Sequence, residues 1–207
     1  MPDGSYFGCC ACIASAGVAL LPLYSVVERN EAVVFNEYPE GSFDFGAISF
    51  EVGKGYFEKG GCRIVVHTRQ NCMKKIFFRI PSWAQQPVVS IGREEYPIIG
   101  SYVEIERAWT DGEEISIDFG IDLRLHRLNG KIAYTYGAFV LARDSWKQDD
   151  IDDPVCAETV YEVLTPDEGE YIRIRLKNDV LLTDYQSCNR NWYDKNAYLS
   201  VWLDEKE

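Results

Sequence analysis

Histidine and positive charge are both scarce in this chain of 207 residues. The two histidines lie in different surroundings: His67 alternates with apolar neighbours, as a strand residue does, and His126 stands between Arg124 and Arg127 as a surface residue does. We identify no third group that would complete a Ser/His/Asp or Cys/His set with either histidine. The 21 basic residues are outnumbered by 33 acidic ones, which gives a formal net charge of −12. This charge argues against nucleic acid or an anionic membrane surface as a partner, because neither offers a counter-charge.

The N-terminal region lacks the basic residues that a signal peptide requires. Residues 7–23 are apolar and rich in small side chains, but no Lys or Arg precedes Arg29. Pro22 and the short length also argue against a membrane span. Seven cysteines, three of them at Cys9, Cys10 and Cys12, do not have the spacing of a disulfide framework. We therefore expect reduced thiols and a cytoplasmic location.

Composition otherwise fits an ordinary globular protein with a real core. Hydrophobic residues make up 46% of the chain and charged residues 26%. Aromatic residues, at 14%, favour β-structure and are compatible with carbohydrate-binding surfaces. The sequence has no internal repeat and no low-complexity tract.

Periodicity predicts one helix followed by many strands. Residues 8–27 form the helical candidate, and its apolar residues lie on nearly all sides, so it must be buried against other elements. From Ala32 onward the period is two, and Asp111-Gly112 and Asn129-Gly130 are the strongest hairpin turns. Short strands with turn signals between them indicate a mainly β protein, an antiparallel β-sandwich with a short N-terminal helix. The expected strands are 32–36, 43–50, 63–68, 75–80, 88–91, 102–107, 114–119, 123–127, 132–136, 139–142, 159–164, 171–176, 180–184 and 197–203.

This pattern divides the chain into three segments. Residues 1–30 hold the helix, residues 31–145 form the β-sandwich, and residues 146–207 carry an acidic loop and the strands that complete the sandwich. The acidic loop, residues 144–155, has carboxylates that suggest calcium binding. It lacks the glycine and the terminal glutamate of an ordered calcium loop, so we interpret it as a solvated charge run.

The adjacent thiols Cys9 and Cys10 are the strongest candidates for chemistry. They follow Gly8 at the start of the expected helix, where free N–H groups and partial positive charge stabilise a thiolate, the form that attacks carbon or binds metal. Cys12 lies about one turn from Cys9 and could share its face. A free cysteine can equally serve as a small buried hydrophobe, and that structural interpretation stays open.

Among the tryptophans, Trp192 is the best candidate for stacking on a sugar ring. It lies in the expected loop 189–194, whereas Trp83 and Trp109 sit at strand ends and are better explained as sandwich core. Glu113 and Glu114 are adjacent strand residues that point to opposite faces, so they do not form an acid/base pair.

Four stretches resemble the C-terminal part of glycoside hydrolase family 127, the β-L-arabinofuranosidase-type enzymes. The first is Gly-Cys-Cys at 8–10 with the following helix and Ala-Val-Val-Phe-Asn-Glu-Tyr at 32–38. The second is Phe-Arg-Ile-Pro-Ser-Trp-Ala at 78–84. The third is Tyr-Val-Glu-Ile-Glu-Arg-Ala-Trp-Thr-Asp-Gly at 102–112, and the fourth covers 130–144 with 182–185 and 200–203.

The resemblance implies a helical (α/α) barrel followed by β-sandwich modules, with the N-terminal helix here left over from that barrel. It also implies a retaining mechanism in which Cys9 is the nucleophile, Cys9 and Cys10 bind zinc, and a glutamic acid protonates the leaving oxygen. The family's other zinc ligands and its acid/base glutamate precede the cysteine pair by a long stretch. Here eight residues precede Cys9, and Asp3 is the one acid among them.

These departures leave three hypotheses open. The favoured one is the C-terminal portion of a family 127-type glycosidase that is inactive alone, with zinc and carbohydrate belonging to the full-length parent and none expected in this chain. The others are a non-catalytic carbohydrate-binding or structural β-sandwich, and a complete small zinc glycosidase using Cys9. We do not expect Cys156 and Glu158 to replace the missing ligands, because four-coordinate zinc tolerates little misplacement. The apolar segment 7–23 is expected to expose surface that the barrel would have covered, and therefore either to mediate self-association into a homo-oligomer or to be disordered.

Overall fold

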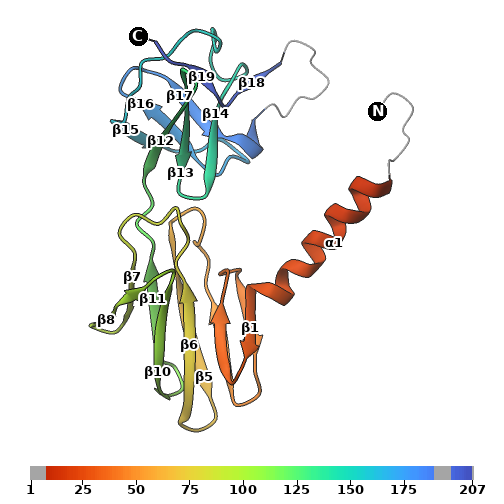
Figure 1. Cartoon of the computed structure of the whole chain (residues 1–207), viewed down its shortest axis with the longest axis vertical. Coiled ribbons are helices and arrows are strands. Elements are labelled where there is room, and N and C mark those ends of the chain that lie inside the picture. Colours follow the sequence, from red (N-terminus) through yellow and green to blue (C-terminus); the bar gives the residue numbers. More distant parts are fainter. Residues whose placement is uncertain (1–7, 189–196, 207) are drawn as a thin grey trace. The chain divides into compact units, whose positions relative to one another are not determined.

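The computed structural model describes residues 8–188 and 197–206, with the side chains of residues 8–11 left out (Figure 1). One α-helix, α1 (Gly8–Ser25), precedes a series of strands within these residues. The strands are β1 (Val26–Arg29), β2 (Ala32–Phe35), β3 (Gly41–Asp44), β4 (Ile48–Val52), β5 (Gly61–Thr68), β6 (Cys72–Arg79), β7 (Val88–Ile91), β8 (Glu94–Tyr96), β9 (Ile98–Ile99), β10 (Tyr102–Trp109), β11 (Glu114–Asp118), β12 (Leu123–Leu128), β13 (Lys131–Tyr136), β14 (Phe139–Asp144), β15 (Tyr161–Leu164), β16 (Arg173–Leu176), β17 (Leu181–Asp184), β18 (Leu199–Ser200) and β19 (Leu203–Asp204); the 3-10 helix η1 (Tyr185–Ser187) follows β17.

The chain forms two compact units. Unit 1 comprises the described residues up to Tyr56 together with Gly61–Ser82 and Gln86–Phe119. Unit 2 comprises Phe57–Gly60, Trp83–Gln85 and the described residues from Gly120 onward. Strands β12 to β14, which the sequence placed in the segment 31–145, thus belong to the same unit as the residues that follow them.

Unit 1 is a sandwich of two sheets. One sheet has the strand order β1-β2-β6-β10-β9, and the other has the order β3-β4-β5-β11-β7-β8. Alternate residues of these strands are buried, as in β10 and β11, because successive side chains point to opposite faces. Phe35 of β2 meets Phe50 of β4 edge to face, with their centroids 5.2 Å apart, so the core lies between the two sheets. The predicted mainly β fold with antiparallel sheets is confirmed.

Two features of unit 1 differ from the sequence expectation. Strand β2 pairs with β6 in parallel, so the sandwich is not antiparallel throughout. The turn at Asp111-Gly112 is not a hairpin, because β10 pairs with β6 and β9 while β11 pairs with β5 and β7. This turn carries the chain from one sheet to the other, so the hairpin prediction was wrong there.

Unit 2 is built on a sheet with the order β12-β13-β14-β17-β16-β15, joined by β18 beside β14 and β19 beside β13. Asn129 and Gly130 connect β12 and β13 as a two-residue hairpin, with Leu128 opposite Lys131. Both turn residues have positive φ, 51° and 73°, which matches the right-handed twist of the strands and favours Asn-Gly. Here the hairpin prediction is confirmed. The buried core of this unit contains Leu123, Ile132, Tyr134, Tyr136, Phe139, Leu141, Val155, Ile172, Ile174, Leu176, Val180, Leu182 and Leu203.

The acidic loop after β14 folds around a buried arginine. The Arg143 guanidinium donates to the carbonyl oxygens of Asp150, Ile151 and Asp153 at 2.9–3.1 Å. Ile151 is buried, while the side chains of Asp149, Asp150, Asp152 and Asp153 are exposed. The carboxylates are therefore solvated, as expected, but the backbone that carries them is held in place by charge-assisted hydrogen bonds.

Candidate functional site

The backbone of Cys9 and Cys10 is helical, within the described part of α1 (Gly8–Ser25). The expected stabilisation of a thiolate depends on free N–H groups at a helix start, and it stays a prediction. The side chains of Cys9 and Cys10 are outside the described residues, and so is Trp192. Their proposed roles as nucleophile, metal ligands and sugar platform therefore stay predictions.

Apolar side chains of α1 are exposed. Every described side chain from Cys12 to Tyr24 is exposed, including Ile13, Val18, Leu21 and Leu23. Residues 12–23 thus expose the apolar surface that the sequence predicts for a helix whose cover is missing. The helix ends earlier than expected, since residues 26 and 27 begin β1. Among the described residues, no helix is apolar over a stretch that would cross a membrane.

Cys156 and Glu158, which were considered as replacement zinc ligands, make contacts typical of structural residues. Glu158 accepts hydrogen bonds from the backbone N–H groups of Thr159 and Val160, both at 2.8 Å, and these lower its pKa. Cys156 is exposed beside it. Within the part of the chain whose side chains are described, no three His, Cys, Asp or Glu side chains come together as a metal site.

Both histidines are exposed strand residues. His67 lies 3.7 Å from a carboxylate oxygen of Glu51 and 3.5 Å from one of Asp111. The His126 Nε2 lies 2.9 Å from the Thr135 Oγ1. The partner of His126 is thus a hydroxyl on the neighbouring strand β13, and the partners of His67 are carboxylates.

Glu113 and Glu114 have separate partners. Glu113 binds Arg107 at 2.9 Å and accepts from the Thr110 N–H at 2.8 Å, whereas Glu114 pairs with Arg63 at 3.0 Å. The expectation that they form no acid/base pair is consistent with these contacts.

Among the described residues, the thiols of Cys62 and Cys188 are buried. Burial raises the pKa of Cys62 to about 12. The pKa of Cys188 also rises to about 12, first through burial and then through the carboxylates of Asp144, Asp184 and Glu170. A thiol with such a pKa is protonated at neutral pH, and a thiol is a weaker nucleophile than a thiolate. The five cysteines whose side chains are described form no disulfide.

Unit 2 contains a pocket of about 320 Å³ that the sequence did not indicate. It is lined by Phe57, Glu58, Ala138, Phe139, Tyr171 and Gln186. The rings of Phe139 and Tyr171 stack with centroids 5.9 Å apart and planes at 25°. Phe57 meets Phe139 edge to face at 6.5 Å. Three aromatic rings thus form one connected wall, with a carboxylate and a carboxamide among the lining residues.

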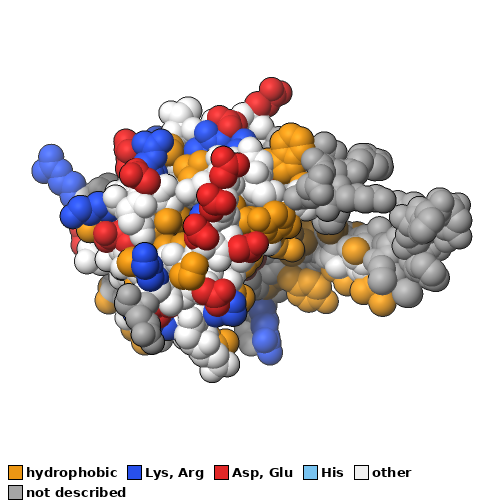
Figure 2. Space-filling view, turned by 90° about the horizontal axis from the view of Figure 1, so that it is seen from above, with side chains coloured by type: hydrophobic (Ala, Val, Ile, Leu, Met, Phe, Trp, Pro, Cys, Tyr) orange, Lys and Arg blue, Asp and Glu red, His pale blue; other side chains and the backbone are white. Residues whose placement is uncertain are grey.

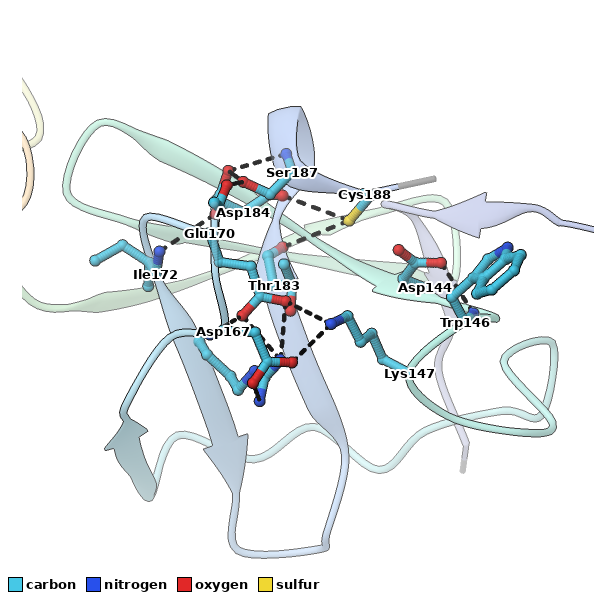
Figure 3. Close-up of polar contacts among 12 residues, drawn as sticks. Asp144, Trp146, Lys147, Asp167, Glu170, Ile172, Thr183, Asp184, Ser187 and Cys188 are labelled. Carbon is cyan, nitrogen blue, oxygen red and sulfur yellow. Dashed lines mark hydrogen bonds and ion pairs between the residues drawn. The ribbon is translucent and has the colours of Figure 1, made fainter. Parts of the chain in front are cut away.

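A buried carboxylate positions two of the pocket residues. Asp184 is fully buried at the end of β17, and its Oδ2 accepts from the N–H groups of Tyr171 and Ile172 at 2.9 and 3.2 Å. Its Oδ1 accepts from the N–H and Oγ–H of Ser187, at 3.1 and 2.7 Å (Figure 3). The backbone of Tyr171 and the η1 turn that carries Gln186 are therefore tied to one side chain.

An ion-pair network supports the segment before Tyr171. Asp167 and Glu170 both bind Arg173 and Lys147, with Lys147 Nζ 2.8 Å from Asp167 and 3.0 Å from Glu170 (Figure 3). Hydrogen bonds from Arg173 and then Lys147 lower the pKa of Asp167 to about 2. Burial raises the pKa of Glu170, but hydrogen bonds from Arg173, the Asp167 N–H and Lys147 outweigh it and leave that pKa lowered. Acidic and basic side chains also lie next to one another on the molecular face drawn in Figure 2.

Comparison with known proteins finds a family likeness in unit 1. The family model described as "Beta-L-arabinofuranosidase, GH127 middle domain" matches residues 33–121. These residues are therefore similar to a GH127 middle domain. The resemblance drawn from the sequence motifs is thereby confirmed for this part of the chain. No curated protein matches the chain.

Solved GH127 structures share the fold of nearly the whole chain. A GH127 β-L-arabinofuranosidase from Geobacillus stearothermophilus T6 superposes with a TM-score of 0.80 and 18% identity, over 96% of this chain and 37% of that one. A GH127 β-arabinofuranosidase gives 0.75 and 19%, over 97% and 39%, and a glycoside hydrolase gives 0.77 and 16%, over 98% and 40%. The chain therefore spans less than half the length of the GH127 structures it matches.

The pocket of this GH127-like chain could not be located from the sequence. Its residues come from the turn after β4, the β13–β14 hairpin, the segment before β16 and η1, which are far apart along the chain. Among the lining residues, the adjacent Phe57 and Glu58 form a local sequence pattern, and such a pair also occurs in an ordinary turn. The Cys pair, in contrast, was visible because its residues are neighbours in sequence.

Proposed function

We propose that this chain is the β-rich portion of a β-L-arabinofuranosidase-like glycoside hydrolase and is not catalytic by itself. The observation that carries the proposal is the GH127 middle-domain match at residues 33–121. The fold likeness supports it, because it extends over at least 96% of this chain but over no more than 40% of the matched structures. The arabinofuranoside substrate class is that of the arabinofuranosidases among those structures.

This chain contains only part of the ligand set that a zinc site requires. Carried over from the family, Cys9 is the nucleophile and Cys9 with Cys10 binds zinc. A zinc site in a protein takes four ligands, or three and an open position, so two thiolates are an incomplete set. The described residues offer no cluster of three metal-ligating side chains to complete it. We therefore assign no catalytic step to this chain alone.

Helix α1 is the surface through which we expect the catalytic barrel to join unit 1. Its exposed side chains include Ile13, Val18, Leu21 and Leu23, and a helix that is apolar on all sides normally packs against other elements. Contiguous apolar surface of this kind marks a site of association. Without a barrel the same surface would bring two copies of the chain together, which is the homo-oligomer expected from the sequence.

The purified chain tests the proposal directly. We expect no hydrolysis of a chromogenic β-L-arabinofuranoside by the reduced chain with added zinc, and the same result for Cys9→Ala. Turnover that requires stoichiometric zinc and is lost in Cys9→Ala would contradict the proposal and favour a complete small enzyme.

Light scattering on the same samples tests the role of α1. Leu21→Glu places a charge on the helix, and Leu128→Glu does the same at an equally exposed position of unit 2 (59% and 57% exposed). We expect the wild type and Leu128→Glu to self-associate and Leu21→Glu to remain monomeric. A wild-type chain that is monomeric at every concentration would count against α1 as an association surface.

A further inference from the structure

Two of the aromatic rings that line the pocket of unit 2 are only partly buried in the protein core. Phe57 and Tyr171 are 48% and 49% exposed, although large aromatic side chains are usually mostly buried. Phe139 between them is buried, and its ring is covered by Tyr171. Two half-exposed rings therefore lie at the edge of one hydrophobic core.

Polar groups suited to hydroxyls accompany these rings. Glu58 contributes a carboxylate and Gln186 a carboxamide to the lining. Both groups are planar; the carboxylate accepts hydrogen bonds from neighbouring hydroxyls, and the carboxamide can both donate and accept. Ala138, at the β13–β14 turn, contributes only a methyl group and leaves room beside the rings. The cavity volume of about 320 Å³ is at the lower end of the range for small-molecule sites.

The lining excludes two other classes of ligand. Glu58 is the one carboxylate among the described lining residues, which include no Lys, Arg or His, and the chain carries a net charge of −12, so an anion would be repelled. A quaternary ammonium group would need aromatic faces on several sides, as in an aromatic cage. The stacking of Tyr171 on Phe139 removes one of those faces and leaves an open wall instead.

The site is also held in shape before a ligand arrives. Asp184 fixes the Tyr171 backbone and the η1 turn through hydrogen bonds of 2.7–3.2 Å, as described above. A wall that is already ordered loses less conformational entropy when it binds. This distinguishes the pocket from exposed aromatic residues that lie singly on the surface.

We propose that the pocket formed by Phe57, Glu58, Tyr171 and Gln186 binds one ring of a neutral saccharide, with the apolar face of the sugar on the aromatic wall and its hydroxyls on the carboxylate and carboxamide. The proposal deepens the proposed function and rests on it for the choice of arabinose as the sugar. The site would hold a substrate chain on unit 2 and takes no part in bond cleavage.

An NMR titration of the full chain tests this site. The probe is methyl β-L-arabinofuranoside, followed through the backbone amides of residues 57–58, 138–139, 171–172 and 186. We expect saturable shifts with a Kd on the order of 1 mM, the weak end of specific recognition. Phe57→Ala and Tyr171→Ala each remove one stacking ring and should weaken binding roughly tenfold. Tyr171→Phe keeps the ring and should bind within about threefold of wild type.

Tyr185→Ala is the matched control. Tyr185 lies on η1 beside Gln186 and is similarly exposed, at 54%, but does not line the pocket. We expect it to bind the sugar as the wild type does. We expect all variants to fold, because both truncated rings are half exposed, and their amide spectra check this.

Three results would overturn the proposal. The first is the absence of saturable shifts at about 50 mM sugar, far above the expected Kd. The second is undiminished binding in both Phe57→Ala and Tyr171→Ala. The third is a response to choline without a response to the sugar, which would make the wall a cation site. Because the titration needs neither zinc nor a barrel, its outcome is independent of the hydrolysis assay.

Discussion

Replacing Asp184 by asparagine should destabilise unit 2 by about 2–4 kcal/mol. The substitution keeps the shape of the side chain but exchanges one acceptor oxygen for an NH₂ group. If that group faces Tyr171 and Ile172, two buried backbone N–H groups lose their acceptor. If it faces Ser187, the Ser187 hydroxyl can turn to the Gly169 carbonyl oxygen, 3.2 Å away, and accept from the NH₂ group. The second arrangement is cheaper, and it leaves only the Ser187 N–H without a partner.

The magnitude follows from that arrangement. One unsatisfied buried donor costs about 1–3 kcal/mol, and the remaining hydrogen bonds lose the strength that a charged acceptor gives them. Urea unfolding gives the change in free energy, and hydrogen exchange of residues 171–188 shows where it occurs. Glu162→Gln is the control, because Glu162 is exposed and its pair with Arg175 at 3.8 Å should contribute at most about 1 kcal/mol. An Asp184→Asn variant as stable as Glu162→Gln would refute the reasoning.

Two further predictions concern a turn and an ion-pair network. Gly130→Ala should lower the stability of unit 2 by about 1–2 kcal/mol, because Gly130 has a φ of 73°, which an alanine adopts only with strain. Gly17→Ala, in the exposed helix, should be neutral or stabilising. Thermal unfolding of the two variants checks this, and equal effects would contradict it. Acidification should destabilise unit 2 between about pH 4 and pH 2. The pKa of Asp167 is lowered from 3.8 to about 2 in the folded state, so its contribution is present above the unfolded value and is lost as the pH falls through the folded one. Urea midpoints against pH should show this loss in wild type and a flatter profile in Asp167→Asn, and identical profiles would count against the network.

Local signals predicted the local structure of this chain well. Asn129-Gly130 forms the expected hairpin because its turn geometry is determined by the two residues themselves. Asp111-Gly112 has the same local signal, yet the flanking strands β10 and β11 join different sheets. Which sheet a strand joins depends on its long-range pairing, and no local pattern records that choice. The parallel pairing of β2 with β6 escaped prediction for the same reason.

The same distinction applies to the candidate sites. The cysteine pair is a prediction from the sequence, made because its two thiols are adjacent in an expected helix. The aromatic pocket could not be predicted in this way, because Phe57, Phe139 and Tyr171 become neighbours only after unit 2 has folded. Asp184 was expected only as a strand residue, and its role in holding Tyr171 and Ser187 follows from burial rather than from any motif.

The loop after β14 carries its own counter-ion. In a calcium loop, backbone oxygens are gathered by a metal that must be supplied from solution and can leave again. Here Arg143 occupies the equivalent role toward the oxygens of Asp150, Ile151 and Asp153 and is covalently part of the chain. The group that gathers these oxygens cannot dissociate from the segment, so we expect chelators to leave its conformation unchanged.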